Sequence, residues 1–558
     1  MREIVTIQVG TFANYVGSHF WNFQDELLGL AEEANGDPIY KSPSLDMDVL
    51  YRAGETQQVP LVLYLLLVNY MMRFHPLIRQ MLSHGDVLKH VSEPRKKNIF
   101  LQRLCEEEQP NHNVPTNHVE KSADTPDVGL QDKDLVACLE NEVHFWTDFS
   151  KVHYHPQSLY ELHGSWTTAQ EFDNYGIGRE FFSGSFHEEE VNERLRFFVE
   201  ECDHIQGIQF ILDDYGGFSS VAADFLEHIA DEYPNKPVLL YSARGPGGCK
   251  NATSKRASIK KVLHDAVSFS RLSSLCKLMV PLGLPSLSTS KVSAFLRVDD
   301  SKPFHCSAVY AASIHSLSLP FRMDPPGPTE NCVYITGAMD VWGLVQMLTG
   351  QARQNTVAIL DTAIPAPCLK GDSVHGPFMR NLHPLTPETA VDGEDPQAVE
   401  SLVVHGALSS GLRASISEVK DSVYSAYQHG LPKPMFLHLS AALCPLPIPL
   451  PFPSIFGNLV GQHGELLGNP IQGNIPRGSL DVDSIPMAAR LRSSSAILPF
   501  IQTRSDNLGR YGIERGAAGT QLLRDWGFAK DEVEDMGESL SRMLTSLNPH
   551  VETLSDSD

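Results

Sequence analysis

The sequence predicts an α/β fold built on a mostly parallel sheet. Residues 4–9 are β-branched and apolar, as in a buried strand, and Gly10 ends that run. Apolar residues then recur at helical spacing over residues 14–30. A strand, a glycine turn and a helix in this order are typical of the first unit of an α/β domain.

The stretch 190–242 repeats this pattern more completely. We expect five elements there: a helix over 191–201, a strand over 205–212, a turn at Gly216-Gly217, a helix over 221–233 and a strand over 238–241. A strand, a glycine turn, a helix and a strand make a right-handed βαβ crossover. The pattern therefore predicts parallel strands that lie side by side.

The composition excludes some classes of function. The chain has 558 residues, of which 68 are acidic and 44 basic, so its formal net charge is −24. Nucleic acids and anionic membranes attract basic surfaces, so general nucleic-acid binding and broad electrostatic docking on a membrane are disfavoured. Nine cysteines without a C-x-x-C pair favour a reducing compartment over a disulfide framework or a zinc cage.

The N-terminus does not resemble a targeting segment, because Arg2 and Glu3 stand where a secretory signal would be apolar. The longest apolar run covers residues 59–72 and contains Pro60 and Asn69. A spanning helix needs about 20 apolar residues, so we expect a buried strand or helix and no transmembrane span.

Composition shifts divide the chain into four parts: 1–104, a polar acidic insertion over 105–139, 140–330, and 331–558. Regular structure is expected to resume near Leu135. The run 445–453 has a proline at every second position, which excludes a helix or a central strand. It is either an SH3-type docking motif or an arm packed on the domain, and its apolar residues favour the arm. An amphipathic helix is expected over 533–547.

Several motifs resemble those of tubulins. The first ten residues are similar to the tubulin opening, and the glycine-rich loop that follows it in tubulins has a counterpart in Gly10-Thr-Phe-Ala-Asn-Tyr-Val-Gly17. Ile205-Gln-Gly-Ile208 and Asp213-Asp-Tyr-Gly-Gly-Phe-Ser-Ser220 resemble a second tubulin strand and its glycine loop. Residues 307–323 resemble the tubulin helix that ends in S-I-T-x-S-L-R-F.

The combination resembles the Misato family of tubulin-like proteins. Its marks are Phe20-Trp-Asn-Phe-Gln-Asp25, Asp48-Val-Leu-Tyr-Arg52 and Phe198-Val-Glu-Glu-Cys-Asp203. The resemblance covers residues 1–55 and 140–350 well and is looser beyond them. It implies a tubulin-like three-layer sandwich, with 1–104 as the Misato segment II part and a divergent α/β region at the C-terminal end.

The resemblance also implies where a nucleotide would bind. In tubulin-like folds, two glycine loops at the carboxyl ends of parallel strands wrap the phosphates. The candidate GTP-binding residues are therefore Gly10, Thr11, Asn14, Gly216, Gly217, Phe218, Ser219 and Ser220. Phe218 and Val221 are bulky where tubulins have small residues, and Asp213 and Asp214 would repel a triphosphate unless Mg²⁺ intervened. The loops are either a GTP site or packing turns, and the sequence favours packing turns.

Hydrolysis is not expected. Tubulin-type enzymes hydrolyse GTP with an acidic loop of the next subunit, and the counterpart here is Gly337-Ala-Met-Asp-Val-Trp342. This alignment places Asp340 at the tubulin Asn position and Trp342 at the acid, where an indole cannot polarise water. No other catalytic signature occurs. His153 and His155 alternate without a third ligand, so we predict neither catalytic residues nor a metal site.

By resemblance, the expected function is non-enzymatic: the organisation of mitochondria, in their distribution, morphology and fusion. The protein would be cytosolic and bind the outer mitochondrial surface from outside, with proteins of that surface as partners and with tubulin or a chaperonin as further candidates. Two alternatives stay open. One is a GTP-binding, polymerising GTPase, and the other is an adaptor or chaperone-like factor for tubulin and the cytoskeleton.

Overall fold

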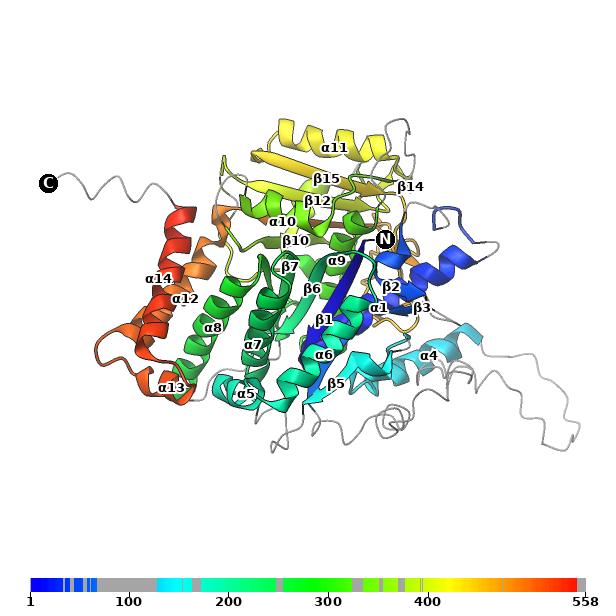
Figure 1. Ribbon diagram of the computed structural model, residues 1–558. Coiled ribbons are helices and arrows are strands. Elements are labelled where there is room, and N and C mark those ends of the chain that lie inside the picture. Colours follow the sequence, from blue (N-terminus) through cyan, green and yellow to red (C-terminus); the bar gives the residue numbers. More distant parts are fainter. Residues whose placement is uncertain are drawn as a thin grey trace, which may run out of the picture.

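Two six-stranded sheets form the framework of the described chain (Figure 1). The computed structural model describes residues 2–33, 36–40, 45–53, 58–60, 62–67, 128–152, 154–162, 172–246, 254–323, 335–350, 355–369, 377–391, 393, 395–473 and 475–548.

The N-terminal sheet is parallel throughout, as the βαβ pattern predicts. In spatial order its strands are β5 (Leu159–Leu162), β4 (Val62–Leu67), β1 (Glu3–Val9), β6 (Ile205–Asp213), β7 (Val238–Ala243) and β8 (Leu278–Leu282). β1 pairs with both β4 and β6, so it lies inside the sheet and every one of its side chains is buried.

Helices cover both faces of this sheet and make the three layers. One face packs on α1 (Thr11–Glu32) and α9 (Pro303–Arg322). The other packs on α5 (Tyr175–Phe182), α6 (Phe186–Glu200), α7 (Gly217–Glu232) and α8 (Lys255–Leu275). The predicted α/β sandwich and the elements expected over 4–30 and 190–242 are therefore confirmed.

The C-terminal sheet is mixed. Its order is β11 (His383–Pro384), β10 (Ile359–Ala363), β18 (Met487–Ser493), β12 (Val399–His405), β15 (Phe436–Ala442) and β9 (Ile335–Thr336). Only β12 and β15 pair in parallel. α10 (Val341–Gly350) and α9 pack on one face, and α11 (Ile416–Gln428) on the other.

α9 joins the two halves. It touches α1 as well as β12 and β18, and every side chain from Phe304 to Arg322 is buried. A helix buried on all sides needs partners for its polar groups. The Oγ atom of Ser313 therefore donates to Val309 O, and that of Ser316 lies 2.9 Å from both Ala312 O and His405 Nε2.

Three further helices flank α8: α12 (Leu498–Leu508), α13 (Thr520–Asp525) and α14 (Lys530–Leu547), the orange and red elements of Figure 1. α14 confirms the amphipathic helix expected near the end of the chain, with Val533, Met536, Leu540 and Leu547 buried. Smaller helical elements complete the described chain: α4 (Val128–Asn141), η1 (Met47–Val49), η4 (Trp146–Asp148), η5 (Pro156–Ser158), η7 (Lys291–Ser293), η8 (Phe378–Asn381), η9 (Ser495–Ile497) and the π-helix η10 (Gly509–Ile513). Three two-stranded antiparallel sheets accompany them: β2–β3 (Tyr51–Ala53, Gln58–Pro60), β13–β14 (Leu408–Ser409, Leu412–Arg413) and β16–β17 (Leu446–Pro447, Ser484–Ile485).

The proline-rich run 445–453 is a packed arm, as its composition favoured. Leu446, Ile448 and Phe452 are buried in the same core as α1 and α9. The Phe452 ring lies 5.9 Å from that of Phe23 and stacks at 5.6 Å on Phe456. These side chains are therefore unavailable to an SH3-type partner.

Two expectations fall partly outside the described residues. In the apolar run 59–72, residues 59–60 belong to β3 and residues 62–67 form β4, which pairs with β1 and β5; the rest of the run is not described. Most of the insertion 105–139 is also not described, but α4 begins at Val128, before Leu135. Among the described residues, no helix is long and apolar enough to cross a bilayer.

Candidate functional site

The two predicted glycine loops meet at one edge of the N-terminal sheet. β1 and β6 are parallel neighbours, so the loops that follow them leave the sheet on the same side. Gly10 has a φ of 107°, and a Cβ built on it would lie 2.5 Å from Cβ of Asp213. Only glycine therefore allows the first loop to approach the second this closely.

Bulky side chains fill the first loop. Thr11 is the first residue of α1 and is partly buried. The Phe12 ring meets Tyr310 edge-on at 5.8 Å, and a Cβ on Gly245 would lie 3.0 Å from it. Asn14 is wholly buried, and neither polar atom of its side-chain amide has a hydrogen-bond partner among the described residues.

The second loop is occupied by contacts within the chain. Gly216 has a φ of 69° and precedes α7, while the N–H of Gly217, the first residue of that helix, donates to Phe172 O at 2.7 Å. The Phe218 ring meets Phe172 edge-on at 5.1 Å. Ser220 Oγ donates to Tyr175 O at 2.6 Å. Ser219 Oγ bonds to Ser268 Oγ on α8.

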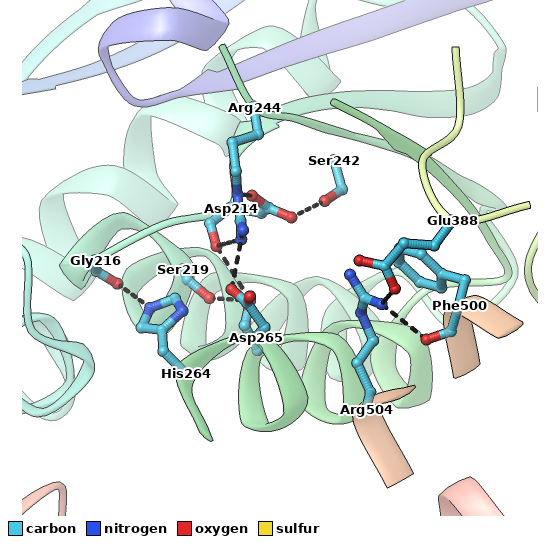
Figure 2. Close-up of polar contacts among 11 residues, drawn as sticks. Asp214, Gly216, Ser219, Ser242, Arg244, His264, Asp265, Glu388, Phe500 and Arg504 are labelled. Carbon is cyan, nitrogen blue, oxygen red and sulfur yellow. Dashed lines mark hydrogen bonds and ion pairs between the residues drawn. The ribbon is translucent and has the colours of Figure 1, made fainter. Parts of the chain in front are cut away.

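The carboxylate of Asp214 is bound by a partly buried cation, Arg244 (Figure 2). Arg244 Nε donates to Asp214 Oδ1 at 2.8 Å, and Ser242 Oγ donates to Oδ2 at 2.5 Å. A second nitrogen of Arg244 lies 2.9 Å from Asp265 Oδ1 on α8. Burial lowers the pKa of the Arg244 guanidinium, but the two carboxylates raise it well above its usual value.

Asp213 has a different environment from its neighbour. Its Oδ2 accepts the N–H of Phe12 at 3.4 Å. Burial and the charge of Asp214 raise the pKa of the Asp213 carboxyl to about 7. A substantial fraction of this carboxyl is therefore protonated at neutral pH.

His264 of α8 contacts the glycine turn at Gly216 and supports it. Its Nε2 donates to Gly216 O at 3.1 Å, and its ring lies 5.0 Å from that of Tyr215. Burial lowers the pKa of His264, so the imidazole is neutral. Trp526, which follows α13, packs on the same histidine with ring centroids 6.1 Å apart.

The C-terminal part of the chain extends this ionic network. Arg504 of α12 donates to Glu388 Oε2 at 2.8 Å and lies over the Phe500 ring, 3.3 Å from its centroid. Figure 2 shows this pair beside Asp265. Burial lowers the pKa of Arg504, and the negative charges of Glu388 and Asp265 partly oppose that shift.

The loop at Asp340 lies at the opposite end of β6. Val341 N donates at 3.2 Å to the side chain of Gln206, near the first residue of that strand. Asp340 Oδ1 accepts the N–H of Gly343 at 2.7 Å, which caps the start of α10. Trp342 is 46% exposed. The structure therefore separates these residues from the two glycine loops by the length of the sheet.

Sequence reasoning missed three residues of this site: Phe172, Arg244 and His264. Arg244 directly follows β7, so the rule that places ligands at the carboxyl ends of strands could have drawn attention to it. No local signal distinguishes the other two. Among the described residues, no group of three or more His, Cys, Asp or Glu side chains could hold a metal ion.

Comparisons with known proteins agree with this architecture. A Misato Segment II tubulin-like domain matches residues 2–118, and a Tubulin domain matches residues 137–323. Protein misato homolog 1 of Mus musculus is 26% identical over 589 residues, with 97% of each chain covered. The Homo sapiens protein of that name is 25% identical with the same coverage. Protein DML1 of Gibberella zeae is 27% identical over 387 residues, which are 66% of this chain and 68% of its own.

The chain is similar to Misato proteins along almost its whole length. Both matched domains are tubulin-like, and they cover most of the chain from β1 through α9, including the two glycine loops. The site described above therefore lies in the part of the chain that is similar to tubulin domains.

We predict that Gly216→Ala destabilises the protein more than Gly184→Ala does. Both glycines have a positive φ, 69° and 65°, so both substitutions strain the backbone. A Cβ on Gly216 would also lie 2.4 Å from Phe172 O, whereas one on Gly184 meets nothing within 4 Å. The free energy of unfolding should fall by about 1–3 kcal/mol more in Gly216→Ala. Equal losses in chemical denaturation would refute the close packing of the turn.

We predict that Asp213→Asn changes the pH dependence of stability. A carboxyl whose folded-state pKa is raised to about 7 favours folding when protonated, so its contribution is complete below pH 4 and is lost as the pH rises to 7. The melting temperature of the parent, relative to Asp213→Asn, should therefore fall from pH 5 to pH 8. Asp214→Asn is the matched control, and it should destabilise at every pH because Arg244 loses a partner. Parallel profiles for Asp213→Asn and the parent would contradict the environment assigned to Asp213.

Proposed function

We propose that this Misato-family protein organises mitochondria, in their distribution, morphology and fusion, as a tubulin-like protein that does not hydrolyse GTP. The mitochondrial part of this proposal rests on the family resemblance. The non-enzymatic part rests on the geometry of the two loops and of the loop at Asp340.

One observation carries the proposal: groups of the second loop that would hold a phosphate are engaged with the chain itself. The N–H of Gly217, at the start of α7, donates to Phe172 O. The rings of Phe12 and Phe218 occupy the two loops. A helix N-terminus binds an anion through free N–H groups and partial positive charge. In this chain a carbonyl oxygen and aromatic rings replace the anion, so the loops act as packing turns.

Charge supports the same conclusion. Asp213 and Asp214 end β6 beside the turn, and the one cation bound there, Arg244, is shared between Asp214 and Asp265. A triphosphate would also face the carboxyl of Asp213, which has no free cation beside it among the described residues. The fraction of Asp213 that is ionised at neutral pH therefore repels a triphosphate.

The position at the mitochondrion is part of the proposal. The net charge of −24 disfavours a broad electrostatic attachment to anionic lipid, so we propose proteins of the outer surface as partners. We therefore propose that the protein acts from the cytosol and attaches peripherally to the outer mitochondrial surface.

A polymerising GTPase is the rival function, and one observation favours it. The glycine loops and the loop at Asp340 lie at opposite ends of β6, so head-to-tail contact between two copies would bring them together. This arrangement is what catalysis in trans requires. The same arrangement also follows from the fold alone, because the glycine loops and the loop at Asp340 lie at opposite ends of the sheet in any case.

We predict that purified protein hydrolyses GTP far more slowly than tubulin and shows no saturable binding of a fluorescent GTP analogue. Trp342 cannot activate water, and the Gly217 N–H is already bonded. The measurement is phosphate release with tubulin assayed in parallel. Turnover at a tubulin-like rate, lost in Asp340→Asn but kept in Asp173→Asn, would establish the GTPase instead.

We predict that the protein on isolated mitochondria is digested by added protease and released by a carbonate wash. Both results follow from peripheral attachment to the outer surface. An integral outer-membrane protein and a matrix protein serve as controls in the same samples. Protection from protease would refute the outer position, and retention after the wash would show an anchored protein.

A further inference from the structure

The first turn of α8 presents an exposed serine behind two unpaired cations. Lys255 and Arg256 lie three and two residues before Ser258, and all three residues are exposed. Neither cation takes part in an ion pair among the described residues. Ser254 caps the helix, since its Oγ accepts the N–H of Ala257 at 3.2 Å. The group of Lys255, Arg256 and Ser258 is therefore accessible from solvent.

We propose that Ser258 is a phosphorylation site for a basophilic serine/threonine kinase. Kinases select substrates by charge pattern, and an acidic substrate groove favours basic residues just before the acceptor. Lys255-Arg256 is the only adjacent basic pair in the sequence with a serine or threonine two residues after it. The inference is independent of the mitochondrial role.

The surrounding sequence strengthens the pattern. Residues 255–261 contain four basic residues and no acidic one, in a chain whose net charge is −24. An acidic groove would be repelled by most of the surface and attracted by this turn. Charge thus directs such a kinase to α8 rather than to the rest of the chain.

Other serines behind an arginine are less suitable. Arg492, three residues before Ser495, is buried and bound to Asp361 at 2.7 Å. Arg271, three residues before Ser274, is paired with Glu227 at 3.2 Å and has no second basic residue beside it. A kinase groove would have to break these pairs, whereas Lys255 and Arg256 are free.

The helix can accommodate the product. Ser258 is in the first turn of α8, where the aligned peptide dipoles favour negative charge. Lys255 and Lys261 are three residues before and after it, a spacing that places side chains on the same helix face. A phosphoserine carries a charge of about −1.5 to −2, so it would be stabilised by the dipole and both lysines.

Access requires only local opening. Kinases bind an extended segment, and the hydrogen bond from Ser258 N to Ser254 O holds the first turn. The helix is anchored further along by Leu263, Val267 and Phe269, which are buried. Opening of the first turn therefore leaves the packed part of α8 in place.

The chemistry is a phosphoryl transfer from ATP. Ser258 Oγ attacks the γ-phosphorus of ATP, and a new Oγ–P bond forms while the bond from that phosphorus to the β,γ-bridging oxygen breaks. ADP leaves with that oxygen. The hydroxyl proton of Ser258 passes to the carboxylate base of the kinase.

The test is to incubate the full-length protein with ATP and the catalytic subunit of cAMP-dependent protein kinase, and to map phosphate by mass spectrometry. We expect phosphate on Ser258, none there in Ser258→Ala, and an initial rate about tenfold lower in Arg256→Ala, the loss of one charge pair. Arg271→Ala is the matched control and should leave the rate at Ser258 unchanged. Both arginines are at the surface, so melting curves should show that both variants fold.

Three results would overturn the assignment. Phosphate could appear only on other residues, or the rate at Ser258 could be the same in Arg256→Ala and the parent. Ser258 could also be modified only after heat denaturation, which would show that the folded turn hides it. An acid-directed kinase, run in parallel, should leave Ser258 unmodified.

Discussion

The guanidinium of Arg244 holds the carboxyl edge of the N-terminal sheet together. It joins Asp214 at the end of β6 to Asp265 on α8, while its own backbone directly follows β7. Removing one partner of such a partly buried ion pair leaves the other charge without compensation and therefore destabilises the fold. The position of α8 therefore depends on Arg244. Since His264 of α8 donates to Gly216 O, the support of the Gly216 turn depends on Arg244 as well.

In the proposed function the N-terminal edge folds without a nucleotide, and this internal network explains how. A ligand that binds only the folded state stabilises it, so a fold that loses the ligand must replace that stabilisation. In this chain, aromatic packing and ion pairs at the edge supply stabilisation of this kind. Phe172 closes the start of α7, and Arg244 neutralises a carboxylate that would otherwise be buried alone. The contribution is permanent, since it does not depend on the concentration of any ligand.

The sequence predicted the elements of this edge but not their contacts. β1, α1, β6, α7 and β7 follow from hydrophobic periods within short windows, and the packed proline arm follows from its composition. The contacts that fill the edge join residues far apart in the chain. Arg244 and Asp214 are 30 residues apart, and His264 and Gly216 are 48 apart. No local period contains that information. The sequence could therefore show that the loops differ from those of tubulins, but not which groups occupy them.

The C-terminal part of the chain takes part in the same replacement. Trp526 packs on His264 and Tyr175, and a Cβ on Gly176 would lie 2.9 Å from Cα of Trp526. This contact presses α5 against the start of α7, where Gly178 lies close to Gly217 O. The segment that covers the second glycine loop is thus held from outside by residues near the end of the chain. Opening the loop for a nucleotide would disturb both layers of packing at once, which supports the proposal that these loops act as packing turns.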